Sequence, residues 1–336
     1  MPRSRGQPGP GRPWRRRATL ALLPALLAAP ALAQPPRWPQ RPITLVNPFA
    51  PGGSTDLTAR AVAELLGEAL GVPVVVENRP GGGTSIAATM VAGAKPDGYT
   101  LLAGSPSLAI NPALQPGLTP RDPQRELAPI GTTYASAYVL VVGSALPIHD
   151  LDGLLAAAKA EPGAMNFASS GIGATNHLAL ELFCHLAGVE ITHIPYRGAA
   201  PALLDLRSGR VQGMFAGATE IGALVREGVL RPLAVTSLQP VPQFPEVPTI
   251  AARLPGFDVT VWQGIFAPAA TPPEVLAVLE AALLRVTRGE TLSARLREQG
   301  VRVTPGGAGD LRRLLAEETA RWGQVIRTAG IRLEQP

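Results

Sequence analysis

Residues 46–60, with the sequence VNPFAPGGSTDLTAR, constrain the fold more than any other stretch of this chain. They read as the end of a β-strand, a Pro/Gly loop and the first turn of a helix, which apolar spacing extends to Gly71. Ser54 or Thr55 is suited to cap that helix, and Asp56 falls in its first turn. A glycine-rich loop at a helix N-terminus can bind an anion through unpaired N–H groups. It can equally be a plain strand-to-helix connection.

Size and charge limit the classes of function. Apolar residues make up 46% of the 336 residues but aromatic residues only 4%, so Ala, Leu and Val must build the core of one large domain or two domains. The formal charge of +5 comes from residues 1–33, which contain six arginines and no acid. Without them 24 basic side chains face 25 acidic ones, a net charge of −1. We therefore expect no nucleic-acid partner.

Residues 1–33 have the pattern of an export signal. Arg15–Arg17 supply the positive region, Ala18–Pro30 the short apolar region, and Ala31–Ala33 an A-x-A site with cleavage expected before Gln34. The apolar region is shorter than the ~20 residues that a membrane-spanning helix needs. Export to the periplasm, by the Sec or the Tat route, is therefore favoured over a membrane anchor.

The rest of the chain alternates predicted strands and helices, which indicates an α/β fold. Three successive strands end near Phe49, Glu77 and Ala103 in loops of Gly, Ser, Thr and Pro. In an open parallel sheet the loops at the carboxyl ends of the strands meet at one crevice, so we expect these loops to form one wall of a binding site. The candidate ligand-binding residues in the second and third of these loops are Gly83, Thr84 and Ser105.

A second loop of small residues, 169–175, precedes the predicted helix that contains Cys184. It repeats the loop-to-helix arrangement of residues 52–56, which suggests a ligand held between two domains. We expect Cys184, the only cysteine, to be a small buried apolar residue rather than a nucleophile or metal ligand. His177 and His185 are eight residues apart, too far for a metal-binding pair on one helix turn, and we expect them to be structural or to cap the loop.

Common catalytic patterns are absent from the sequence. It contains no G-x-S-x-G elbow, no G-x-x-x-x-G-K-[ST] loop and no H-E-x-x-H helix. Residues 171–173 open like a dinucleotide fingerprint, but Asn176 replaces its third glycine. Ser105, Ser169 and Ser170 have no evident base partner. We predict no enzyme activity, no cofactor and no metal, and hydrogen-bond donation to a small acidic or polar molecule.

Nine blocks, in order over nearly the whole mature chain, resemble the Bug-type extracytoplasmic receptors of tripartite tricarboxylate transporters. They are PFAPGGSTDLTAR, VVVENRPGGGTS, KPDGYTLL, INPAL, ASSGIGATNHLALELF, THIPYRGAAPALLDLRSGRV, LRPLAVTS, PEVPTI and WQGIFAPAATPPEVL. The resemblance implies a periplasmic binding-protein fold of type II-like architecture, with two α/β domains and a small carboxylate bound in the cleft between them. It also implies delivery of this ligand to membrane permease subunits, without catalysis. No heptad or apolar patch in the sequence argues against a monomer.

The same resemblance gives domain limits and site residues. It implies a signal peptide at 1–33, a first part of domain 1 at 34–139, domain 2 at 140–260 and the return of domain 1 at 261–336. The resemblance implies a carboxylate held mainly by loop N–H groups, hydroxyls and ordered waters rather than by an arginine clamp. By position, the ligand-binding residues are Gly52, Gly53, Ser54, Thr55 and Asp56 in the first loop and Ser170, Gly171, Gly173 and Thr175 in the opposing loop.

The chain departs from the family pattern at two positions. Ala87 stands where the last glycine of PGAGG-x-x-G is common, and Arg197 stands where lysine is common, as a surface charge or facing the cleft. Asp56 would repel a nearby anion, so we expect it to act as a cap or to hold a water. Two other classes remain open: a secreted α/β hydrolase, with Ser105 as the candidate nucleophile, and a receptor that signals to a membrane kinase.

Overall fold

The computed structural model describes residues 9, 38–298, 301–328 and 330–331. The expected export signal lies outside these residues apart from Gly9. The described residues from Trp38 onward form one compact unit. Within the described ranges, no helix is long and apolar enough to cross a membrane.

Ten strands form one sheet in the order β2-β1-β3-β9-β4-β7-β5-β6, and β8 and β10 also pair with β4. The strands β1, β2 and β3 are parallel to one another, as are β5, β6 and β7, whereas β9 runs antiparallel to β3 and β4. Their bounds are β1 Ile43–Asn47, β2 Val74–Asn78, β3 Thr100–Gly104, β4 Leu127–Gly143, β5 Asn166–Ser169, β6 Thr192–Pro195, β7 Gly213–Gly217, β8 Leu230–Val235, β9 Thr260–Pro268 and β10 Arg302–Gly307.

The long strand β4 belongs to two halves of this sheet. Its residues 127–137 pair with β9, and its residues 138–143 pair with β7 and β8. We call β1, β2, β3, β9, β10 and residues 127–137 the first half, and β5–β8 and residues 138–143 the second half. The domain limits expected at 139/140 and 260/261 fall inside β4 and inside β9, and they remain a prediction.

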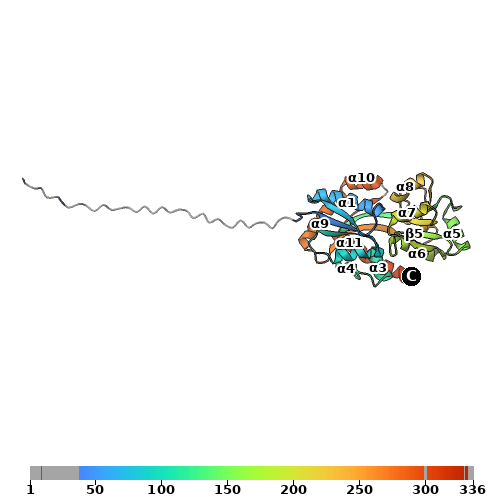
Figure 1. The fold of residues 1–336 in the computed structure, drawn as a ribbon, viewed down its shortest axis with the longest axis horizontal. Helices are drawn as coiled ribbons and strands as arrows, with labels where there is room; N and C mark the ends of the chain where they lie inside the picture. The colour runs from blue at the N-terminus through green and yellow to red at the C-terminus, as the bar shows by residue number, and fades with distance from the viewer. Residues whose placement is uncertain (1–8, 10–37, 299–300, 329, 332–336) are drawn as a thin grey trace, which may run out of the picture. The chain divides into compact units, whose positions relative to one another are not determined.

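Helices cover both faces of each half (Figure 1). The first half carries on one face α1 (Ser54–Leu70), α9 (Pro273–Arg288) and α10 (Glu290–Glu298), and on the other α2 (Ser85–Ala92), α3 (Ser107–Leu114), α4 (Pro123–Glu126) and α11 (Ala308–Thr328). The second half carries on one face α5 (Leu151–Ala160) and α6 (Thr175–Ala187), and on the other α7 (Ala199–Arg207) and α8 (Ala218–Arg226). Two short 3₁₀ turns are η1 (Gly82–Thr84) and η2 (Ile250–Ala252).

Many elements follow the sequence closely. Asp150 caps α5 because its Oδ1 accepts a hydrogen bond of 2.7 Å from the N–H of Gly153. The helix α11 begins at Ala308, and Asp310 in its first turn accepts from the N–H of Gly307.

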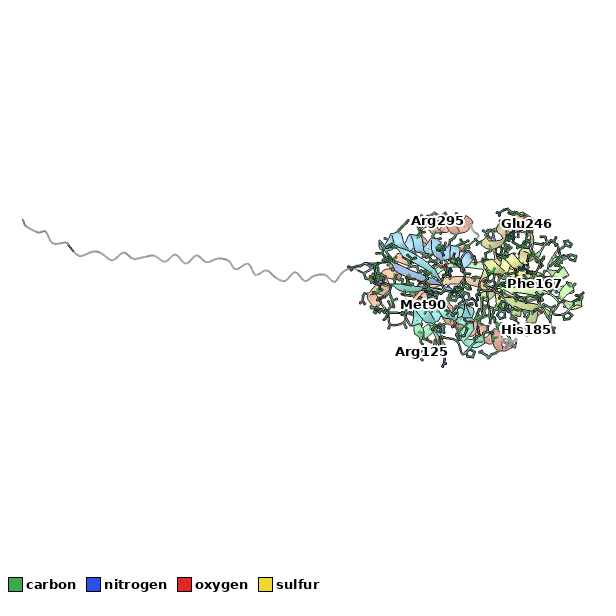
Figure 2. All side chains as sticks on the ribbon, in the orientation of Figure 1. Met90, Arg125, Phe167, His185, Glu246 and Arg295 are labelled. Carbon is green, nitrogen blue, oxygen red and sulfur yellow. The ribbon has the colours of Figure 1, made fainter. Side chains whose placement is uncertain are left out.

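The core is built mainly of Ala, Leu, Val and Ile, as the composition predicts. Alternate residues of β4 point to opposite faces, so Val139 packs against α7 and α8 whereas Leu140 packs with α5 and α6. A few aromatic rings fill the interior of the second half. Phe167 lies inside it, and His185 lies at its periphery (Figure 2).

Candidate functional site

Loops from both halves surround a cavity of about 420 Å³. The first half contributes the ends of β1 and β2, through residues 48–49 and 80–84. The second half contributes the ends of β5 and β6, through residues 170–172, Ala174 and residues 195–197. Carboxyl ends of parallel strands are where α/β sheets bind ligands, and the volume lies in the usual range for a small-molecule site.

The loop after β2 enters this cavity in a conformation that favours glycine. Gly82 and Gly83 have φ of 55° and 56°, and Thr84 has φ of 78°. A Cβ built on Gly83 would lie 2.2 Å from the carbonyl oxygen of Ile172, so this loop touches the second half directly. Gly83 and Thr84 lie at the wall of the cavity. Ala87 is buried in the core, so its departure from the family pattern leaves the loop itself intact.

The first predicted loop, residues 52–56, does not line this cavity. The N-cap residue of α1 is Gly53, and no side chain caps this helix end. The prediction that Ser54 or Thr55 caps the helix is therefore wrong, because both residues lie within it. Asp56 is 2% exposed and orders the loop. Its carboxylate accepts hydrogen bonds from the N–H of Gly52 and from the Arg60 and Asn78 side chains.

Burial alone would raise the pKa of Asp56, but the hydrogen bonds from its neighbours outweigh burial and hold that pKa below its usual value. The carboxylate therefore stabilises the loop that contains it by accepting these hydrogen bonds, a role similar to that expected of a cap. The hydrogen bonds to Asp56 come from Gly52 N at 3.0 Å, Arg60 Nε at 3.0 Å and Asn78 Nδ2 at 2.7 Å.

The carboxylate of Glu220, a residue of the second half, lies at the N-terminus of α1. Its Oε1 accepts from the N–H of Ser54 at 2.7 Å, and its Oε2 accepts from the N–H of Gly217 at 2.9 Å. Sequence reasoning missed this residue. A glutamate three residues after a glycine N-cap is half of a capping-box pattern, and that pattern could have marked Glu220 and the start of α8.

In the second predicted loop, 169–175, N–H groups donate hydrogen bonds to nearby side chains of the same chain. Ser170 donates to Asn176 Oδ1 at 3.1 Å, and Gly173 donates to His177 Nδ1 at 3.2 Å. Ser170 and Gly171 line the cavity, whereas Gly173 and Thr175 are buried beside it. A Cβ on Gly173 would lie 2.3 Å from Asn111 Oδ1, so this loop touches the first half. Ligand binding by the residues of both loops remains a prediction.

Two histidines, His177 and His193, lie next to the second loop and form hydrogen bonds with it. The ring of His177 stacks on His193 with centroids 4.0 Å apart, and His193 Nε2 lies 2.6 Å from Ser169 Oγ. The expectation that Ser169 has no base partner is therefore wrong. Ser169 is nevertheless fully buried, and its hydroxyl also accepts from the N–H of Gly171, so the pair holds the loop. Burial and the neighbouring His177 lower the pKa of His193 to about 3.

The remaining candidates behave as structural residues. His177 holds the N–H of Gly173, which confirms its expected part as a loop cap, and His185 is exposed. Cys184 is half-buried against the core, and burial together with Glu181 raises the pKa of its thiol to about 12. In the described part of the chain, no group of three His, Cys, Asp or Glu residues could hold a metal ion.

Several buried polar atoms near the cavity have no hydrogen-bond partner in the described residues. Ser105 is one of them. It is 5% exposed, does not line the cavity and has no base against its hydroxyl. An unpaired buried polar group is costly, so such atoms mark places where a ligand or water can bind. The set comprises Thr84 Oγ1, Ser105 Oγ, Ser107 Oγ, Asn111 Oδ1 and Gln115 Nε2.

A continuous α/β sheet with a cavity between its two halves is the architecture of a solute-binding protein. The sequence profile of the TctC family, described as the tripartite tricarboxylate transporter family receptor, matches residues 58–331. The chain therefore belongs to this family of solute-binding receptors.

Individual relatives agree with this assignment. Protein BugT of Bordetella pertussis is 35% identical over 321 residues, 94% of this chain and 98% of BugT. A protein of R. palustris solved with adipate has a TM-score of 0.84 and 35% identity, covering 88% of this chain and 99% of its own. MatC from Rhodopseudomonas palustris with bound malate has a TM-score of 0.82 and 33% identity, covering 86% of this chain and 100% of its own. These matches confirm the Bug-type resemblance and the periplasmic binding-protein fold.

Proposed function

We propose that this chain is an extracytoplasmic solute receptor that binds a small organic or amino-acid carboxylate between its halves and delivers it to the permease subunits of a tripartite tricarboxylate transporter. The observation that carries the proposal is the cavity of about 420 Å³ walled by loops of both halves, in a family with relatives solved with adipate and malate. In this proposal the receptor is a periplasmic monomer, exported by residues 1–33, and it uses neither a cofactor nor nucleic acid.

Arg197 gives the cavity its positive charge. It is the one charged side chain among the described residues that line it, and it lies two residues after the end of β6. A guanidinium donates several hydrogen bonds to a carboxylate in fixed geometry. The N–H groups of Ser170, Gly171, Gly173 and Ala174 are already bonded within the chain. Arg197 is therefore the chief side-chain donor that we assign to the ligand carboxylate.

Arg197→Gln should weaken carboxylate binding about tenfold, because a charge-assisted hydrogen bond is worth about 1.5–3 kcal/mol and the site is partly open to water. Calorimetric titration of the variant measures this loss. Arg207→Gln, at the exposed end of α7 and away from the cavity, is the matched control and should bind like the wild type. Equal affinity of the two variants would remove Arg197 from the site.

Thermal shifts of the mature chain from Gln34 test the function itself. The panel contains mono-, di- and tricarboxylates, amino acids and aromatic acids, and one group should raise the unfolding temperature saturably. At a ligand concentration of 100 Kd the stabilisation is about 2.7 kcal/mol. A flat panel requires mass spectrometry of the denatured protein, where a released carboxylate still supports the proposal. A flat panel with an empty extract contradicts it.

A further inference from the structure

Two close contacts between the halves lie at or next to the ligand cavity. A Cβ built on Gly198 would lie 2.9 Å from the Cβ of Ala50, and a Cβ built on Gly83 would lie 2.2 Å from the carbonyl oxygen of Ile172. Each contact joins a loop of the first half to a loop of the second half. Side chains beside these contacts line the cavity, so their chemistry decides which ligand body fits there.

Aromatic side chains line the cavity beside the first contact. Phe49, from the first half, directly precedes Ala50, and Tyr196, from the second half, follows β6. Both side chains are half-buried. The hydroxyl of Tyr196 donates to Asp205 Oδ2 at 2.7 Å, and Asp205 does not line the cavity. Tyr196 therefore offers a ligand its ring, because its proton is already used elsewhere.

Two isoleucines from opposite halves line the cavity at the second contact. Ile172 belongs to the contact itself, and Ile86 lies over the adjoining loop, where a Cβ on Gly81 would lie 2.8 Å from Ile86 Cδ1. Ile86 is 54% exposed and Ile172 is 37% exposed. Apolar surface of this kind favours a ligand that covers it with an apolar body, because covering removes it from water.

Three prolines at strand ends also line the cavity. Pro48 follows β1 directly, Pro80 lies two residues after β2, and Pro195 is the last residue of β6. Proline has no backbone N–H, so the chain cannot donate a hydrogen bond to a ligand at these three positions. The rings add apolar surface where a strand end would otherwise present a donor.

The charges on the lining suit one carboxylate and no other ion. Arg197 is the one charged side chain among the described lining residues, and none of these residues is acidic. A second carboxylate therefore has no second cation to pair with, and a ligand ammonium group has no carboxylate. The polar side chains on the lining besides Arg197 and Tyr196 are neutral, namely Thr84, Gln115 and Ser170.

We propose that the cavity selects carboxylates with a single charged end and an apolar body, and among them those with an aromatic ring, such as arylalkanoates. The carboxylate binds at Arg197, and the ring lies between the aromatic side chains of one contact and the isoleucines of the other. This inference rests on the proposed function, of which it specifies the ligand class.

Calorimetric titration with 3-phenylpropanoate, hexanoate and adipate tests the ligand class. Hexanoate and adipate have the same chain length and differ by the second carboxylate. We expect 3-phenylpropanoate to bind about tenfold more tightly than adipate or better, with hexanoate between them. The alcohol 3-phenylpropan-1-ol has the same ring without the charge, and it should bind about tenfold more weakly than 3-phenylpropanoate.

Variants of the two isoleucines test where the apolar body lies. Ile86→Thr and Ile172→Thr remove apolar surface from opposite halves and keep a β-branched side chain. Each should weaken binding of 3-phenylpropanoate about threefold to tenfold. Met90→Thr is the matched control, because Met90 lies one turn further along α2, is 38% exposed and does not line the cavity. It should bind like the wild type.

The outcomes separate this inference from the proposed function. Adipate that binds as tightly as 3-phenylpropanoate overturns the inference and leaves a carboxylate receptor. Isoleucine variants that bind like Met90→Thr also overturn it. The alcohol binding as tightly as 3-phenylpropanoate contradicts the carboxylate receptor but not the apolar cavity.

A protein that binds none of the probes is denatured and its extract is analysed by mass spectrometry. A released carboxylate with an apolar body supports the inference, and one with a second charge overturns it. An empty extract contradicts the proposed function and this inference together.

Discussion

Asp56→Ala should lower the free energy of unfolding by about 2–4 kcal/mol. The carboxylate is 2% exposed and joins three pieces of the first half, the loop at Gly52, helix α1 at Arg60 and strand β2 at Asn78. Its loss leaves the buried ends of these donors without an acceptor. The value lies below that for a fully buried ion pair because the side chain of Arg60 is 48% exposed and can turn to water.

Urea unfolding of Asp56→Ala beside Asp152→Ala measures this effect against a matched control. Asp152 also pairs with an arginine, Arg253, but the two side chains are 71% and 57% exposed. An exposed ion pair contributes at most about 1 kcal/mol, so Asp152→Ala should unfold almost like the wild type. Similar losses in both variants would show that the hydrogen bonds of Asp56 do not order the loop.

The same carboxylate gives a pH dependence with a definite sign. The hydrogen bonds hold the folded-state pKa of Asp56 below its usual value, so its contribution is complete above the unfolded-state pKa of about 3.9. It is lost as the pH falls through the folded-state pKa. Between pH 5 and about pH 2, wild type should therefore lose more stability than Asp56→Asn, which cannot titrate at this position. Parallel curves would contradict this role.

The parts of the site that could be predicted from sequence are those that depend on local chemistry. Gly83, Thr84, Ser170 and Gly171 line the cavity, since glycines and small polar residues after a strand mark a loop at its carboxyl end, and their contact with a ligand stays a prediction. The same reasoning placed Asp56 in the first turn of α1 but not its partner Asn78, which belongs to another strand.

The missed residues depend on contacts between distant segments. Glu220 reaches the N-terminus of α1 only because the two halves meet, and His193 reaches Ser169 only because β5 and β6 are neighbours. Neither contact leaves a periodic pattern in the sequence. For this reason the sequence suggested free N–H donors in both loops, whereas the structure gives several of them acceptors from the chain itself.

The full length of β4 could not be predicted from the sequence for the same physical reason. Residues 127–137 become a strand by pairing with β9, more than a hundred residues later in the chain. The elements α3, α8, β8 and β10 were not predicted. The helix α3 contains Pro112, a residue that usually ends a helix, and β10 contains a proline and two glycines, which disfavour a strand.

Gly83→Ala should weaken ligand binding by about tenfold or more, because it prevents the two halves from approaching. The added Cβ would lie 2.2 Å from the carbonyl oxygen of Ile172 in the opposite half, and backbone cannot move aside as a flexible side chain can. The loops that wall the cavity would then be held apart. Calorimetric titration with the carboxylate identified by the thermal-shift panel measures the loss.

Gly82→Ala separates this contact from backbone strain. Gly82 has nearly the same φ as Gly83, 55° against 56°, so alanine is strained by about 1 kcal/mol at either position. A Cβ on Gly82 meets only side chains of the following helix α2, with Ile86 Cγ1 nearest at 3.3 Å. Both variants should therefore lose similar unfolding free energy, and only Gly83→Ala should lose affinity. If the two lose affinity equally, strain in the loop is the cause and the contact with Ile172 is not needed for binding.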